Sequence, residues 1–209
     1  MATTQAPATS STWKIDPSHT LVEFAVKHLM ITTVKGRFTD VEGAVVIVDG
    51  APSASSVNAV IKAASIDTRT GQRDDHLRSA DFLDSANYPD ITFNSTRITG
   101  NDSEFKLTGN LTIRGVTREI TLDATNEGSI KDPWGGERIG FSAKTKFDRR
   151  DFGLTWNQAI ESGGVVVGHD REGVDRARGG EGGVIPRAEL ESHAELQHEG
   201  RLFGRPSRI

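Results

Sequence analysis

The segment FKLTGNLTIRGVTREITLDA, residues 105–124, decides the fold class of this 209-residue chain. Apolar and polar residues alternate along it twice, first over residues 105–113 and then over residues 116–124. A period of two places successive side chains on opposite faces of a β-strand. Arg114-Gly115, between the two runs, is typical of a tight turn. The segment therefore predicts an antiparallel hairpin with one apolar face.

The same alternation recurs on both sides of this hairpin. It covers residues 20–28, 36–48, 57–66, 91–98 and 138–148. Short turns separate the runs, and the helices that parallel strands would need between them are missing from the pattern. We therefore expect an all-β fold, an extended antiparallel sheet of about eight strands closed into a barrel. Such a barrel is wide enough inside to hold a small or slender ligand.

One stretch interrupts the strands. SIDTRTGQRDDHLRSADFLDSANYPDITF, residues 65–93, is dense in charge, and residues 74–84 carry Leu77, Phe82 and Leu83 at helical spacing. Pro89 lacks an amide donor and favours an extended conformation before it. We interpret the stretch as a short helical insertion that forms a lid over the barrel.

Four small residues lie on the faces predicted to point inward. They are Gly43, Ala59, Gly109 and Ala143. They indicate either a lumen that side chains do not fill or, for the glycines, bends and bulges in the strands. The sequence leaves both interpretations open.

Composition restricts the function classes. The formal net charge is −4, without the basic patch of a nucleic-acid-binding protein. The absence of cysteine excludes disulfides and thiolate chemistry. Residues 1–11 have neither the basic nor the apolar region of a secretory signal, and no run is long enough to span a bilayer. We expect a disordered tail over residues 1–11, a cytoplasmic location and no stable membrane insertion.

The histidines and the acidic residues of the lid are the candidates for metal binding and catalysis. His19, His28 and His76 lie on separate motifs without the spacing of a zinc site, so they are interpreted as structural. The acidic residues of the lid, with Asp74 near a predicted helix start, are better explained by the helix dipole and by pairing with arginine than by acid–base catalysis. We predict neither catalytic residues nor a metal or cofactor.

Four motifs occur in a recognisable order. They are DPSHTLVEFAVKHLMITTVKGRF (16–38), the 65–93 stretch, LTGNLTIRGVTREITL (107–122) and DFGLTWNQAIESGGVVVG (151–168). Together they resemble the YceI-like family of polyisoprenoid-binding proteins. The resemblance implies a lipocalin-like barrel domain over residues 12–168 that carries or sequesters a polyisoprenoid or similar long-chain lipid in its lumen. It also implies the cytoplasmic branch of the family and a connection with stress response.

We predict that the inner strand faces bind the apolar chain and that basic lid residues bind a polar head group. The predicted ligand-binding residues are Val22, Phe24, Val26, Val45, Ile47, Ile61, Phe93, Leu107, Leu111, Ile120, Leu122, Phe141, Trp156, Arg69, Arg73, His76 and Arg78. Two alternatives stay open: an enzyme acting on a lipid head group at the lid, and a module that binds a partner at an exposed strand edge. The oligomeric state is also open, with a homodimer as one option.

The chain departs from the family pattern after Gly168. Residues 169–209 do not alternate and contain no lysine, where the family has a last strand that closes the barrel. Read one nucleotide later, the codons possible for GHDREGVDRARGG (168–180) are compatible with Asp-Thr-Ile-Val-Lys-Val-Ser-Ile-Glu-Leu-Glu-Val, a strand of the missing type. We therefore hypothesise that a frameshift near Gly168 changed the rest of the chain. The alternative is a natural tail appended to a barrel that is closed in some other way. The tail is predicted to be mostly disordered, with a short helix over residues 186–198 that Pro186 would begin.

Overall fold

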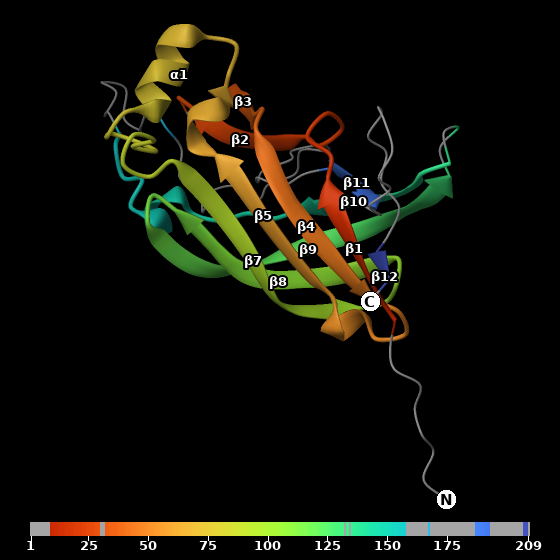
Figure 1. Ribbon diagram of the computed structural model, residues 1–209. Coiled ribbons are helices and arrows are strands. Elements are labelled where there is room, and N and C mark those ends of the chain that lie inside the picture. Colours follow the sequence, from red (N-terminus) through yellow and green to blue (C-terminus); the bar gives the residue numbers. More distant parts are fainter. Residues whose placement is uncertain are drawn as a thin grey trace, which may run out of the picture.

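The computed structural model describes residues 9–29, 32–131, 133, 135–157, 167, 187–192 and 207–208. Within them, the main sheet is antiparallel and strongly curled (Figure 1). Its strands, in spatial order, are β1 (Ser10–Ile15), β4 (Val41–Val48), β5 (Ser56–Lys62), β7 (Asp90–Gly100), β8 (Glu104–Ile113), β9 (Val116–Lys131), β10 (Glu137–Lys144) and β11 (Arg187–Ser192). This confirms the predicted all-β, lipocalin-like barrel.

The pairings return to their starting point through β11. This strand pairs with β10 over Arg138–Ser142 and with β1 over Trp13–Ile15. The short strand β12 (Ser207–Arg208) also pairs with β1. A segment of the atypical tail therefore occupies the position between β10 and β1. The short helix predicted over residues 186–198 is wrong for residues 187–192, because residues 187–191 pair with β10 and residues 190–192 pair with β1. The other residues of that prediction lie outside the described part of the chain.

A smaller structure, which we call the cap, covers one end of the curled sheet (Figure 1). It consists of a sheet of β2 (Val22–His28), β3 (Thr32–Phe38) and β6 (Ile66–Asp67), together with helix α1 (Gly71–Arg78). Both parts of the cap are insertions: residues 16–40 lie between the paired strands β1 and β4, and residues 63–89 between the paired strands β5 and β7. The two insertions join where Arg37 and Phe38 of β3 pair with Asp67 and Ile66 of β6.

The core lies inside the curve of the sheet and beneath the cap. Val22, Leu122 and Phe152 are almost fully buried. Among the described residues there are also three 3₁₀ turns: η1 (Pro52–Ala54), η2 (Ala63–Ser65) and η3 (Arg149–Phe152). Each fully buried aliphatic or aromatic side chain stabilises the fold by about 1.5–3 kcal/mol, so this apolar interior holds the sheet closed in the absence of disulfides.

Several boundaries differ from the sequence prediction. The run 36–48 divides into β3 and β4, because the amides of Thr39 and Asp40 turn to bond Ser65. The run 20–28 is β2 of the cap and does not belong to the barrel ring, where β1 takes that position. β1 begins at Ser10, inside the segment predicted as a tail.

The lid helix also differs in its limits. It covers Gly71–Arg78 instead of residues 74–84. The first turn of the helix is stabilised by the amide of Thr68, which donates to the Asp74 side chain. The helix ends where the amide of Ser79 bonds the carbonyl of His76. Phe82 and Leu83 follow in turns and are still buried.

Candidate apolar ligand site

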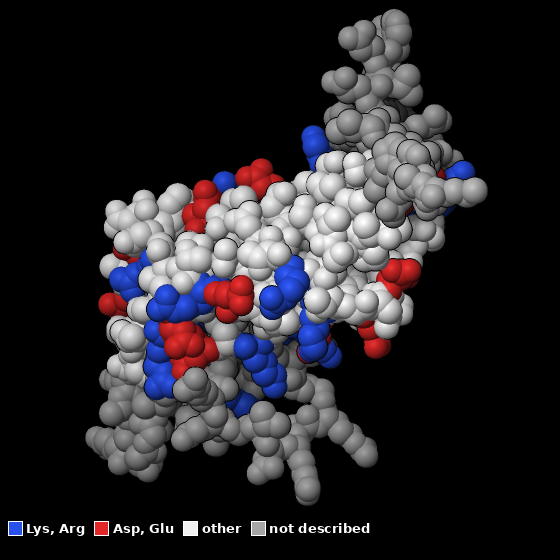
Figure 2. Space-filling view, turned by 90° about the horizontal axis from the view of Figure 1, so that it is seen from below, with Lys and Arg blue, Asp and Glu red and all other residues white. Residues whose placement is uncertain are grey.

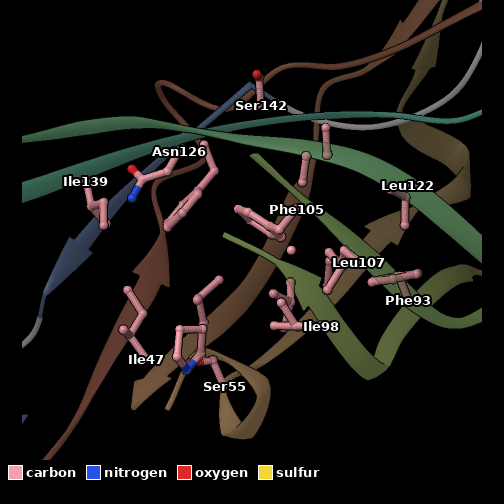
Figure 3. A pocket seen from close by; sticks show the side chains of 18 of the residues that line it. Ile47, Ser55, Phe93, Ile98, Phe105, Leu107, Leu122, Asn126, Ile139 and Ser142 are labelled. Carbon is pink, nitrogen blue, oxygen red and sulfur yellow. The ribbon is translucent and has the colours of Figure 1, made fainter. Parts of the chain in front are cut away.

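A cavity of about 690 Å³ lies inside the barrel. This volume is within the range of roughly 300–1,000 Å³ that is usual for small-molecule sites. Aliphatic and aromatic side chains from seven barrel strands, β1, β4, β5 and β7 to β10, form most of its wall, among them Ile47, Phe93, Ile98, Phe105 and Ile139 (Figure 3). The alternation of each strand explains this, because every second residue faces the lumen. An interior of this kind favours a hydrocarbon over water.

The cavity is closed at the end beneath the cap. Val22 of β2, Val41 of β4 and Ile61 of β5 line it there, and all three are nearly fully buried. Phe38 and Ile66, from the two joined insertions, belong to the same buried cluster. Apolar contacts therefore seal this end of the tube.

The opposite end reaches the surface, and we call it the mouth. It is formed by the turn after β4 with η1, by the turn between β7 and β8, and by the nearby parts of β9 and β10. Its polar residues are Asp49, Ser53, Ser55, Thr99, Asn101, Asp102, Asn126 and Ser142. Asp49, Ser53, Asn101 and Asp102 are exposed, so a ligand in the cavity has contact with solvent here.

The mouth is held in shape by local hydrogen bonds. Asn101 Oδ1 accepts bonds from the amides of Ser103 and Glu104, at 3.0 and 2.8 Å. Ser55 Oγ accepts the amide of Val48 at 3.0 Å. Asn126 Oδ1 accepts the amide of Gly128 at 2.9 Å. These bonds fix the turns around the opening.

The predicted ligand-binding residues divide into two sets. Nine of them line the cavity: Val22, Val45, Ile47, Ile61, Phe93, Leu107, Leu111, Leu122 and Phe141. The other eight do not belong to its wall: Phe24, Val26, Ile120, Trp156, Arg69, Arg73, His76 and Arg78. Phe24 instead packs against Phe38 in the cap, with ring centroids 5.7 Å apart.

The basic lid residues serve the cap itself. Arg73 donates to the hydroxyl and the carbonyl of Thr68, at 2.7 and 2.8 Å, and Arg78 donates to the carbonyls of Ala64 and Ile66. These bonds fasten α1 to the chain before it. The lid and the mouth lie at opposite ends of the barrel, so the structure separates the predicted head-group residues from the open end of the cavity.

His76 belongs to an aromatic cluster of the lid. Its ring lies edge-on to Phe82 and Trp156, with centroids 5.0 and 4.7 Å away, and Nε2 is 2.9 Å from Asp81. Trp156 therefore packs on the lid and not in the lumen. The wall residues that the sequence-based site missed include Phe105 and Ile139, although both lie on the alternating inner faces from which the other wall residues were predicted.

Two carboxyl groups at the cap are stabilised in their charged form. The amide of Arg69 and the guanidinium of Arg37 bond Asp67 and hold its pKa below the usual 3.8. Partial burial raises the pKa of Asp16, but hydrogen bonds from His19 and Ser18 outweigh that effect and lower it overall. The lowered pKa of Asp67 thus depends in part on the pairing of β3 with β6, which brings Arg37 to it.

The described residues limit other chemistries. No three His, Cys, Asp or Glu side chains among them gather as a metal site would require, and this includes His19, His28 and His76. No helix among them has the length and apolar character to cross a bilayer. Acidic and basic side chains lie side by side on the face seen from below, with uncharged areas between them (Figure 2).

In the described part of the chain, the barrel, its apolar lumen and its polar mouth define a lipocalin-like ligand-binding class of protein. Comparison with known proteins narrows this class, because residues 13–172 match the model of the YceI-like domain. The chain belongs to the YceI-like family. It is 39% identical over 175 residues to the protein YceI of Salmonella newport (strain SL254), covering 83% of this chain and 92% of that relative.

Solved structures agree on the fold. The Campylobacter jejuni YceI protein is 36% identical with a TM-score of 0.56, covering 68% of this chain and 86% of that one. BcnA of Burkholderia cenocepacia is 17% identical with a TM-score of 0.63, covering 85% and 98%. A polyisoprenoid binding domain from Saccharophagus degradans is 13% identical with a TM-score of 0.51, covering 86% and 95%.

Proposed function

We propose that the chain binds a long apolar ligand, a polyisoprenoid or similar lipid, in the barrel lumen and carries or sequesters it. The observation that carries this proposal is the cavity of about 690 Å³, closed by apolar residues under the cap and open at a polar mouth. Each methylene moved from water into such an interior gains about 0.8 kcal/mol. An extended chain therefore binds with few polar contacts.

The comparisons support the same role. A structural neighbour is named as a polyisoprenoid binding domain, and the family match over residues 13–172 runs from within β1 through β10. The ligand needs one polar end at most, because only the mouth offers polar groups along the wall. A tube of this kind suits a slender molecule with a long tail better than a compact polar metabolite.

Native mass spectrometry of the full chain, purified without detergent, tests the proposal. The expected result is a protein population that carries a lipid released on denaturation. Phe141→Asp places a charge in the wall and should abolish lipid retention, because an unpaired buried carboxylate is strongly unfavourable. Ile130→Asp on the exposed face of β9 is the matched control and should keep the lipid.

A second variant protects the test against misfolding of Phe141→Asp. Ala143→Phe also lies in the wall, and its added ring enters existing empty space, so the barrel should fold normally and hold less lipid. Circular dichroism checks the fold of each variant. If Ala143→Phe and the native chain retain equal amounts of lipid, the lumen is not the binding site.

A further inference from the structure

The mouth has an unusual balance of charge for a protein that would hold a phosphorylated lipid. Two exposed carboxylates, Asp49 after β4 and Asp102 between β7 and β8, stand at the open end. Among the described residues that line the cavity, none is Lys, Arg or His. A phosphate or pyrophosphate group is normally recognised by such cationic donors.

The mouth also supplies a hydrogen-bond donor. Asn126 is half-buried and lines the cavity (Figure 3), and it pairs with Phe141 of the neighbouring strand β10. Its Oδ1 accepts the amide of Gly128, and its Nδ2 donates to no described residue. The carboxamide nitrogen can therefore donate to a ligand in the cavity that Asn126 lines, while the two carboxylates are acceptors.

From this arrangement we propose that the lipid carried by this chain has an uncharged head group that both donates and accepts hydrogen bonds, such as an alcohol, and that the mouth selects against a pyrophosphate. The head group accepts a bond from Asn126 Nδ2 and donates to a carboxylate at the rim. This inference rests on the proposed function and specifies the ligand of that same cavity. The apolar wall sets the length and slenderness of the ligand, whereas the mouth sets its charge.

The size of the selection follows from electrostatics. A doubly charged head group held beside two exposed carboxylates is disfavoured by roughly tenfold in affinity at low ionic strength. Salt screens charges in solvent over a Debye length of about 8 Å near 0.15 M, so the difference in affinity between the uncharged and the charged head group should decrease as salt is added. An uncharged head group should bind with the same affinity at both ionic strengths.

Two lipids with the same C20 chain provide the test, geranylgeraniol and geranylgeranyl diphosphate. Their binding to the full chain is measured by displacement of a fluorescent apolar probe, at low and at physiological salt. The native chain should bind the alcohol about tenfold more tightly at low salt. The double variant Asp49→Asn, Asp102→Asn should lose most of this difference by gaining affinity for the diphosphate.

Asp40→Asn is the matched control. It removes one carboxylate charge, where the double variant removes two, from an exposed residue next to β4 that lies at the cap end and outside the cavity wall. It should leave both affinities unchanged. Equal or tighter binding of the diphosphate by the native chain would overturn the head-group inference while the proposed lipid-carrying function stands. If neither lipid displaces the probe and no lipid co-purifies, the function and the inference fall together.

Discussion

Asp74 fastens the lid helix to the rest of the cap, and replacing it with Ala tests how the cap is held. Its carboxylate accepts the backbone amide of Thr68 at 2.8 Å and the Thr68 hydroxyl at 2.5 Å. Asp74 and Thr68 are 6% and 5% exposed, so water cannot replace the lost acceptor. The contact joins the first turn of α1 to the residue that follows β6.

The magnitude follows from the two donors. A buried donor left without a partner costs about 1–3 kcal/mol. The Thr68 amide suffers this loss in full, while its hydroxyl can reorient and still accepts from Arg73. We therefore expect Asp74→Ala to lower the free energy of unfolding by about 2–4 kcal/mol. For a chain of this length the thermal midpoint should fall by about 6–12 °C.

Thermal and urea unfolding, followed by tryptophan fluorescence and circular dichroism, measure this change. Asp75→Ala is the control, because the Asp75 side chain is 80% exposed and makes a single surface pair with Arg78. Such pairs contribute little to stability. Asp74→Asn keeps one acceptor and should fall between the two. Equal loss of stability in Asp74→Ala and Asp75→Ala would refute the assigned anchoring role.

Three further predictions follow from the cap, the turns and the tail. The amide of Arg69 and the guanidinium of Arg37 hold the folded pKa of Asp67 below 3.8, so its stabilisation is complete above that pH and is lost as the pH falls through the lower folded value. Asp67→Asn should therefore flatten the acid limb of stability measured by urea unfolding between pH 2 and 6, and an unchanged limb would contradict the stabilisation of the Asp67 carboxylate by these two donors. Gly115→Ala should destabilise the fold by about 1–2 kcal/mol in the same assay, because φ is +73° and the added carbon would lie 2.7 Å from the Tyr88 ring. The control Gly71→Ala adds a carbon that meets nothing within 4 Å and should be neutral or stabilising. Equal effects of the two substitutions would show that the turn at Gly115 tolerates a side chain. If the frameshift hypothesis is right, replacing residues 169–209 with DTIVKVSIELEV should raise the thermal midpoint by about 5 °C or more, because an alternating strand would pair with both β10 and β1. An equal or lower midpoint would count against the frameshift hypothesis.

The strands of the barrel wall could be predicted from the sequence with good accuracy. Residues 104–124 form the expected hairpin of β8 and β9, with Arg114-Gly115 at its turn, because each inner residue is buried by the same lumen. A period of two records which face is buried, and this is a local property of each strand. The nine predicted wall residues that line the cavity all come from this pattern.

The arrangement of the ends could not be predicted in the same way. Charge density in the 65–93 stretch indicated a polar binding surface, but Arg73 and Arg78 use their donors on backbone carbonyls inside the cap. The mouth is instead built from turn residues, such as Asp49 and Asp102, that look like ordinary surface turns in the sequence. Only the order of the paired strands shows that these turns gather at one end. Likewise, β2 has the alternation of a barrel strand, and tertiary pairing with β3 alone assigns it to the cap.

The two insertions that form the cap begin and end on strands that already pair with each other. β1 pairs with β4, and β5 pairs with β7, across the inserted residues. The distance between the two ends of each insertion is therefore fixed by the barrel, and lengthening a connection between fixed ends adds only about 0.6 kcal/mol for each doubling of its length. The lengths of the two insertions can therefore change without altering the pairing of the barrel strands. The cap can be replaced by one of different length on an unchanged barrel, provided that the replacement keeps the short β3–β6 pairing that joins the two insertions.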